Sequence, residues 1–186
     1  MKCILAIGIF ALLLTGCTFV EEPIDEILEL RKSVMESESC SFQSTIYADY
    51  GELSYKFQLD CTTDNDGKMH FTVIHPESIS GITGMISEED ASLTFDDKVL
   101  AIPMLADNQI VPIAAPWVFL KTMKSGYIHG CSKTDDGLLV ILDDSFENCP
   151  LRVELHLDTT NVPVLADIYW NQYCIMSVMI ENFETV

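Results

Sequence analysis

The stretch that decides the fold is CSFQSTIYADYGELSYKFQLDC, residues 40–61, where apolar and other side chains alternate on both sides of a turn. Successive side chains of a strand point to opposite faces, so this period of two predicts strands with one apolar face. A two-residue turn at Tyr50-Gly51 would join the two strands into a hairpin. All apolar residues then share one face, which is the condition that fixes register. The predicted opposite pairs are Ala48 with Leu53, Ile46 with Tyr55, Phe42 with Leu59, and Cys40 with Cys61.

The same register places Cys40 and Cys61 at a separation that a disulfide can bridge. Such a bond would close a loop of about 20 residues and contribute ~3 kcal/mol by the chain-entropy estimate. Two small buried thiols are the alternative, and the sequence leaves both open. The chain has seven cysteines. It contains no C-x-x-C motif and no Cys/His cluster, so no metal site is expected.

The alternation continues through most of the chain, and two segments depart from it. Residues 23–38 carry apolar side chains on one helical face and charged ones on the other, which predicts an amphipathic helix. Residues 103–124 contain three prolines and predict a helical insertion from Trp117 to Lys124. Further strands are expected at residues 69–75, 79–86, 91–95, 99–102, 127–133, 138–142, 151–157, 164–170 and 173–183.

These segments together predict an α+β protein with about ten or eleven short antiparallel strands in meander order. One sheet face is apolar and needs a cover. Only the leading helix and the insertion can supply it.

The first seventeen residues have the features of an export signal. Lys2 precedes an apolar run of about a dozen residues, which is too short to span a bilayer. The run ends in Leu14-Thr15-Gly16-Cys17, which resembles a bacterial lipobox, where the Cys is diacylated and the preceding peptide removed. We therefore expect a lipoprotein signal peptide over residues 1–16, a lipidated Cys17 with a short tether to residue 22, and one domain over residues 23–186.

Charge and side-chain chemistry exclude several functions. The formal net charge is −19, which argues against nucleic-acid binding because that needs clustered Lys and Arg. The four histidines are isolated and the carboxylates fall in turns and on polar faces. No nucleophile elbow or phosphate-binding loop is present. We expect no enzyme activity and no cofactor.

The order of elements is similar to that of the LolA/LolB-like lipoprotein-carrier superfamily. The likeness rests on the Phe71-Thr72-Val73 strand, the segments 76–82 and 93–100, the proline-rich insertion and Asn161-Val162-Pro163. It implies a strongly curved antiparallel sheet, an unclosed half-barrel, whose concave face is covered by helices. It also favours the outer face of a Gram-positive plasma membrane, with the periplasmic face of a Gram-negative membrane as the alternative.

Two functions fit this architecture. The concave face could hold an acyl chain, a lipid or another hydrophobic ligand, or it could be a dry core in a structural or interaction lipoprotein. The expected partners are the membrane, through the anchor, and such a ligand. The segment 110–124 could be a movable cover or a fixed core helix. The residues expected at the ligand or lid are Phe42, Tyr55, Phe57, Phe71, Ile113, Trp117, Phe119 and Leu120.

Overall fold

The computed structural model describes residues 23–186 apart from 89, 97, 102–104, 107–108 and 145–150. Its main element is an antiparallel sheet of eleven strands in the order β6-β5-β4-β3-β2-β1-β13-β12-β11-β10-β9. Strands that are paired in the sheet also follow each other in sequence, except at its centre, where β1 pairs with β13. The bounds of the strands are β1 Cys40–Asp49, β2 Ser54–Thr63, β3 Met69–His75, β4 Thr83–Ile86, β5 Ala91–Phe95, β6 Lys98–Ala101, β9 Tyr127–Thr134, β10 Gly137–Asp143, β11 Leu151–Leu157, β12 Pro163–Trp170 and β13 Tyr173–Thr185.

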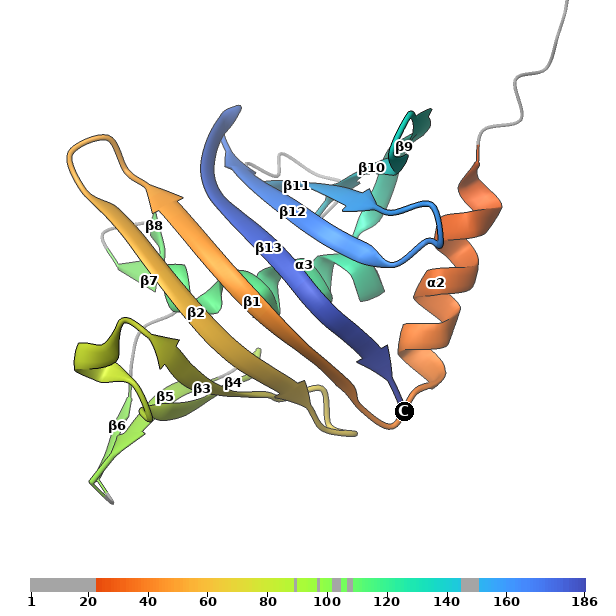
Figure 1. The fold of residues 1–186 in the computed structure, drawn as a ribbon. Helices are drawn as coiled ribbons and strands as arrows, with labels where there is room; N and C mark the ends of the chain where they lie inside the picture. The colour runs from red at the N-terminus through yellow and green to blue at the C-terminus, as the bar shows by residue number, and fades with distance from the viewer. Residues whose placement is uncertain (1–22, 89, 97, 102–104, 107–108, 145–150) are drawn as a thin grey trace, which may run out of the picture.

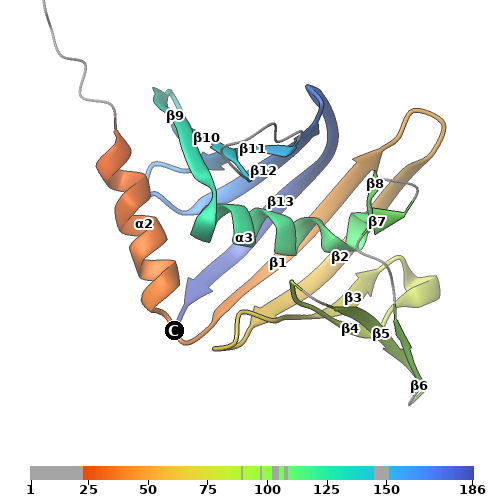
Figure 2. The same ribbon diagram turned by 180° about the vertical axis from the view of Figure 1, so that it is seen from behind.

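The sheet is strongly curved and its two edge strands, β6 and β9, do not meet (Figure 1). The helix α3 (Ala115–Ser125) lies across the inner side of this curve, as the view from behind shows (Figure 2). The helix α2 (Ile24–Glu36) lies at the side of the sheet away from β6. The described residues therefore form the expected unclosed half-barrel, in which one large sheet is accompanied by the helices α2 and α3.

Short elements connect β6 to α3. A small separate hairpin pairs β7 (Leu105–Ala106) with β8 (Gln109–Ile110), and the 3-10 turn η2 (Pro112–Ala114) leads into the helix. The strand expected over residues 79–86 is shorter in the structure, where β4 covers only Thr83–Ile86. The 3-10 turn η1 (Glu77–Ile79) precedes β4, because Pro76 has no N–H to donate to a strand ladder and the turn closes locally between Ile79 N and Pro76 O.

The faces of the β1–β2 hairpin are as predicted, but its register is wrong by two residues. Ala48 lies opposite Tyr55, Ile46 opposite Phe57, and Phe42 opposite Cys61. The loop has four residues, closed by the Tyr50 N–H donating to Leu53 O, instead of a two-residue turn at Tyr50-Gly51. A shift of two leaves every side chain on its own face, so the apolar pattern permits both registers.

The inner face of the sheet and α3 together form one core. Strands β10 and β11 alternate strictly between buried and half-buried side chains, and β1 does so over most of its length. In α3, eight of eleven residues are buried, and Phe119 and Met123 are completely inaccessible. The Phe42 ring meets the Phe119 ring edge to face with centroids 5.5 Å apart. The insertion therefore packs as part of the core of the half-barrel.

Candidate ligand site at the carboxyl end of α3

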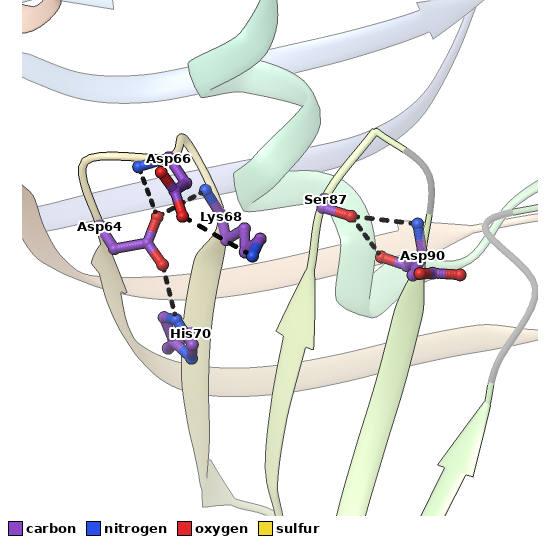
Figure 3. Close-up of polar contacts among 6 residues, drawn as sticks. All are labelled: Asp64, Asp66, Lys68, His70, Ser87 and Asp90. Carbon is purple, nitrogen blue, oxygen red and sulfur yellow. Dashed lines mark hydrogen bonds and ion pairs between the residues drawn. The ribbon is translucent and has the colours of Figure 1, made fainter.

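A pocket of about 420 Å³ opens beside the carboxyl-terminal half of α3. Three segments form its walls: α3 itself, the turn between β2 and β3, and the turn between β4 and β5. The two turns lie side by side at the same end of their strands (Figure 3). The lining residues are Thr63, Asp66, Gly67, Lys68, Ser87, Glu88, Trp117, Leu120, Lys121, Lys124 and Ser125.

Asp64 holds the β2–β3 turn in shape. Its Oδ1 accepts hydrogen bonds from the backbone N–H groups of Asp66 and Lys68, both at 3.0 Å. Its other oxygen, Oδ2, lies 3.2 Å from His70 Nε2 (Figure 3). The contact with His70 and the two backbone donors lower the pKa of the Asp64 carboxyl. A fixed turn positions Lys68 at the pocket, where its Nζ lies 3.8 Å from Asp66.

Ser87 closes the β4–β5 turn in a similar way. Its backbone N–H donates to Asp90 O at 2.8 Å, and its Oγ accepts from Asp90 N at 3.0 Å. The Ser87 hydroxyl and the backbone groups of Asp90 therefore bond to each other within the turn (Figure 3). Glu88 is the lining residue that this turn supplies besides Ser87.

The helix contributes both an apolar wall and positive charge. Trp117 and Leu120 line the pocket although they are only 9% and 3% exposed. Lys121 Nζ lies 5.5 Å from the centre of the Trp117 ring and 3.4 Å from Asp144. Within the described part of the chain, no carboxylate forms an ion pair with Lys124. An apolar wall next to a lysine without an ion-pair partner suits a molecule with an apolar part and an anionic part.

The pocket has an unusual share of the positive charge. Lys68, Lys121 and Lys124 line it, and the whole chain has only ten Lys and Arg against 29 Asp and Glu. Two carboxylates, those of Asp66 and Glu88, line it as well. Because Asp144 lies 3.4 Å from Lys121, the local charges are balanced, in contrast to the net −19 of the chain.

The structure brings only two of the predicted ligand or lid residues, Trp117 and Leu120, to this pocket. Phe42, Phe71 and Phe119 lie in the core, at most 2% exposed. Phe57 and Ile113 are partly buried against the core. Tyr55 is 40% exposed, and its ring stacks on that of Phe57 with centroids 6.1 Å apart.

The pocket residues Lys68, Ser87 and Glu88 were not predicted, because each belongs to a turn whose composition explains it without a site, and Thr63 is the last residue of β2. A lysine is rare enough in this chain for Lys68 to have been a signal.

The predicted pairing of Cys40 with Cys61 is not found. Both are free, fully buried thiols, and Cys61 lies opposite Phe42 because of the corrected register. The backbone N–H of Cys40 donates to Thr63 Oγ1 at 2.8 Å. Burial raises the pKa of the Cys61 thiol to about 12, and Ser44 Oγ lies 3.6 Å from its sulfur. Cys17 and the lipobox lie outside the described residues.

Hydrogen bonds clamp both ends of the segment that contains α3. Before the helix, the Tyr50 hydroxyl donates to the carbonyl of Ile110. At its carboxyl end, Arg31 of α2 donates from Nε to Met123 O at 2.7 Å and from Nη2 to Gly126 O at 2.8 Å. Burial lowers the pKa of Arg31 and raises that of Tyr50 to about 12. These contacts favour the fixed core helix over the movable cover.

Two further features are absent from the described residues. No group of three or more His, Cys, Asp or Glu side chains there is arranged to hold a metal ion. No helix among them is both long and apolar enough to cross a bilayer.

Comparison with known proteins gives similarity in structure only. No protein-family model matches the chain, and no curated protein matches it. Among solved structures it is similar to an uncharacterized conserved protein of Thermus thermophilus, with 12% identity, a TM-score of 0.48, and coverage of 89% of this chain and 88% of that one. It is also similar to the LolA superfamily protein NE2245 of Nitrosomonas europaea, with 8% identity, a TM-score of 0.48, and coverage of 89% and 94%.

A third similar structure is the lipoprotein LppX of Mycobacterium tuberculosis, with 11% identity, a TM-score of 0.40, and coverage of 87% and 94%. The LolA superfamily, which the sequence resemblance names, is thus found among the similar structures.

Proposed function

We propose that this protein is an exported lipoprotein, anchored through Cys17, that binds a hydrophobic ligand with an anionic end, such as a fatty acid or an acidic lipid. The observation that carries the ligand proposal is the pocket at the carboxyl end of α3, where Trp117 and Leu120 meet Lys124. Its volume of about 420 Å³ lies within the range of roughly 300–1,000 Å³ that small-molecule sites occupy.

The side chains suggest how such a ligand would lie. Its apolar part would cover the exposed edges of Trp117 and Leu120, which removes apolar surface from water. Its anionic end would meet Lys124, and the Lys121 ammonium is held nearby by Asp144 and the Trp117 ring. The concave face behind α3 is filled by Phe42, Phe119 and their neighbours, so a longer acyl chain would enter it only if α3 moved.

The role that we propose is binding or carrying, without catalysis, on the outer face of a Gram-positive plasma membrane. The tether between Cys17 and α2 spans residues 18–22, which reach less than about 20 Å when fully extended. The pocket would therefore work close to the bilayer that supplies its ligand. Because the protein is strongly acidic, the acyl anchor would be needed to hold it at an anionic membrane.

The anchor and the ligand are tested separately. In a bacterial host, Cys17→Ser is expected to leave the signal uncut or to release the protein from the membrane fraction. Normal processing and unchanged fractionation of this variant would exclude the lipoprotein interpretation. For the ligand, titration with a fluorescent fatty acid is expected to show saturable binding that Lys124→Glu weakens about tenfold, as the loss of a charged contact does.

Lys56→Glu is the matched control for the ligand, because Lys56 lies over the Tyr47 ring, away from the pocket. It makes the same change of charge and is expected to leave the affinity unchanged. Equal weakening by both variants would indicate a general effect of net charge, and no binding by the wild-type protein would reject the ligand.

The second candidate function is a structural or interaction lipoprotein with a dry core. It is favoured by the burial of eight of the eleven residues of α3 and by the clamps at Arg31 and Tyr50. Native mass spectrometry of the protein purified from its membrane separates the two. A co-purifying lipid would support a carrier, whereas the bare protein, together with no fatty-acid binding, would support the dry core.

A further inference from the structure

The helix α2 has an apolar stripe that the described part of the protein leaves exposed. Ile24, Leu28 and Met35 are 37%, 45% and 62% exposed. Together with Arg31 they follow the spacing i, i+4, i+7, i+11, which places all four on one line along a helix. Ile27 and Val34, on the adjacent line, are completely buried and hold α2 against the rest of the protein.

Arg31 does not interrupt the apolar character of this stripe. Its guanidinium turns inward and donates to Met123 O and Gly126 O at the carboxyl end of α3. The four acidic residues of α2 lie off this line. Asp25 and Glu29 are exposed beside it, Glu36 lies 3.9 Å from Lys32, and Glu26 lies 3.0 Å from Lys133 of β9. The outward surface of the stripe is therefore formed by three aliphatic side chains.

The stripe lies close in sequence to Cys17, the expected site of the lipid anchor, which points to the bilayer as its cover. The helix begins at Ile24, directly after the tether that leads from Cys17. At 1.5 Å per residue, Ile24 and Met35 lie about 16 Å apart along the helix axis. A helix whose apolar line runs along its length, and whose first turn is tied to an acyl anchor, can lie flat on a bilayer with that line at the level of the headgroups.

We propose that the exposed stripe of Ile24, Leu28 and Met35 rests on the bilayer in which the anchor is inserted. This rests on the proposed lipidation of Cys17 and goes beyond it, because the anchor alone would leave the domain free to rotate on its tether. Since Arg31 links the stripe to the end of α3, the contact would also fix the orientation of the pocket relative to the membrane.

The chain has a built-in control for a test by hydroxyl-radical footprinting. Met35 and Met179 are both exposed thioethers, at 62% and 45%, but Met179 lies on β13, away from the stripe. In water Met35 should therefore oxidise at least as fast as Met179. With the full lipidated protein in phosphatidylcholine vesicles, Met35 is expected to oxidise several-fold more slowly than Met179.

Charging the stripe should remove this protection. Leu28→Asp is expected to restore oxidation of Met35, whereas Leu53→Asp, at a 60% exposed position in the β1–β2 loop, should leave it protected. Oxidation of Met35 as fast as that of Met179 in wild-type protein that floats with the vesicles would overturn the proposal.

A second copy of the chain would protect Met35 as well, so the lipid-to-protein ratio must be varied. Protection that persists at high dilution in lipid supports the bilayer, and protection lost on dilution assigns the stripe to a dimer and overturns the proposal. If the protein does not float with the vesicles, the lipid anchor is refuted, and both proposals fail. Flotation without protection rejects the bilayer contact alone.

Discussion

Arg31 donates two hydrogen bonds across the boundary between the two helices, to Met123 O at 2.7 Å and to Gly126 O at 2.8 Å. These carbonyls belong to the last turn of α3 and the residue that follows it, where helix carbonyls have no partner within the helix. A guanidinium there satisfies them and also interacts favourably with the helix dipole. One side chain of α2 therefore fixes the end of the helix that fills the half-barrel.

Arg31→Ala is expected to lower the free energy of unfolding by about 1.5–3 kcal/mol, the usual range for hydrogen bonds from a charged donor. Chemical denaturation followed by circular dichroism measures this change. Lys32→Ala is the control, because the side chains of Lys32 and Glu36 are 71% and 69% exposed and 3.9 Å apart. Such a pair contributes roughly 0–1 kcal/mol. A loss for Arg31→Ala no larger than the control would show that α3 does not depend on this contact.

Trp117 discriminates between a packed helix and a movable cover. It is 9% exposed, so Trp117→Ala is expected to cost about 3–5 kcal/mol, as truncation of a large core side chain does. Phe95→Ala, at a 59% exposed position, should cost less than about 1 kcal/mol. A small effect of Trp117→Ala, combined with faster fatty-acid uptake, would instead indicate that the segment opens.

Thr122 has a buried hydroxyl that none of the described residues satisfies. Replacing it with the isosteric valine removes the desolvated oxygen without changing the shape of the side chain. Thr122→Val is therefore expected to be neutral or to stabilise the protein by about 1 kcal/mol, measured as a change in the urea midpoint.

The matched control for that substitution is Thr63→Val. Thr63 is 4% exposed, and its Oγ1 accepts the Cys40 N–H at 2.8 Å. Its loss leaves a buried donor unpaired and should destabilise by about 1–3 kcal/mol. We therefore predict that Thr63→Val lowers the free energy of unfolding whereas Thr122→Val leaves it unchanged or raises it. Marked destabilisation by Thr122→Val would contradict this prediction.

Cys61 predicts a pH dependence of stability. Burial raises its pKa to about 12, whereas an unfolded cysteine ionises near pH 8.5, about the model-peptide value. The folded state therefore keeps the proton while the unfolded state releases it, so stability falls as pH rises through the window from about 8.5 to 12. Between pH 8 and pH 10 this contribution amounts to a loss of about 2 kcal/mol.

The measurement compares wild-type protein with Cys61→Ala under reducing conditions at several pH values. The variant is less stable at every pH because it leaves a cavity, but it should lose about 2 kcal/mol less than wild type between pH 8 and pH 10. The raised pKa of Tyr50 is present in both proteins and cancels in the difference. Identical losses would show that the Cys61 thiol ionises as readily in the folded state.

The strands were predictable because residues such as Leu151, Val153 and Leu155 alternate with polar neighbours, and alternation reports burial directly. The register of β1 and β2 could not be predicted from this alternation. Tyr55 and Phe57 are two positions apart and share one face of β2, so Ile46 can lie opposite either of them without changing which side chains face inward. The length of the loop at Asn171–Gln172 could not be predicted from the alternation either. Both residues take positive φ in a two-residue loop that pairs Trp170 with Tyr173, although neither is glycine.

The site was predictable only on its helical side. Trp117 and Leu120 lie in an uncharged proline-rich segment that departs from the strand pattern, and this difference drew attention to them. Lys68 and Glu88 lie in two turns that are brought beside α3 by the curvature of the sheet. Curvature depends on how strands β2 to β5 twist and pack, and no local sequence pattern states it.

The central pairing of β1 with β13 constrains when the protein can fold. Cys40 pairs with Thr185, and the Glu38 N–H donates to the carbonyl of Val186 at 2.6 Å, so β1 needs residues more than 140 positions further along the sequence. Pairing over such a sequence separation is slow to form. A ribosome or a translocase that releases the chain from its amino terminus therefore handles a polypeptide whose central strand pair cannot yet form. The centre of the sheet is completed only after β13 has been synthesised.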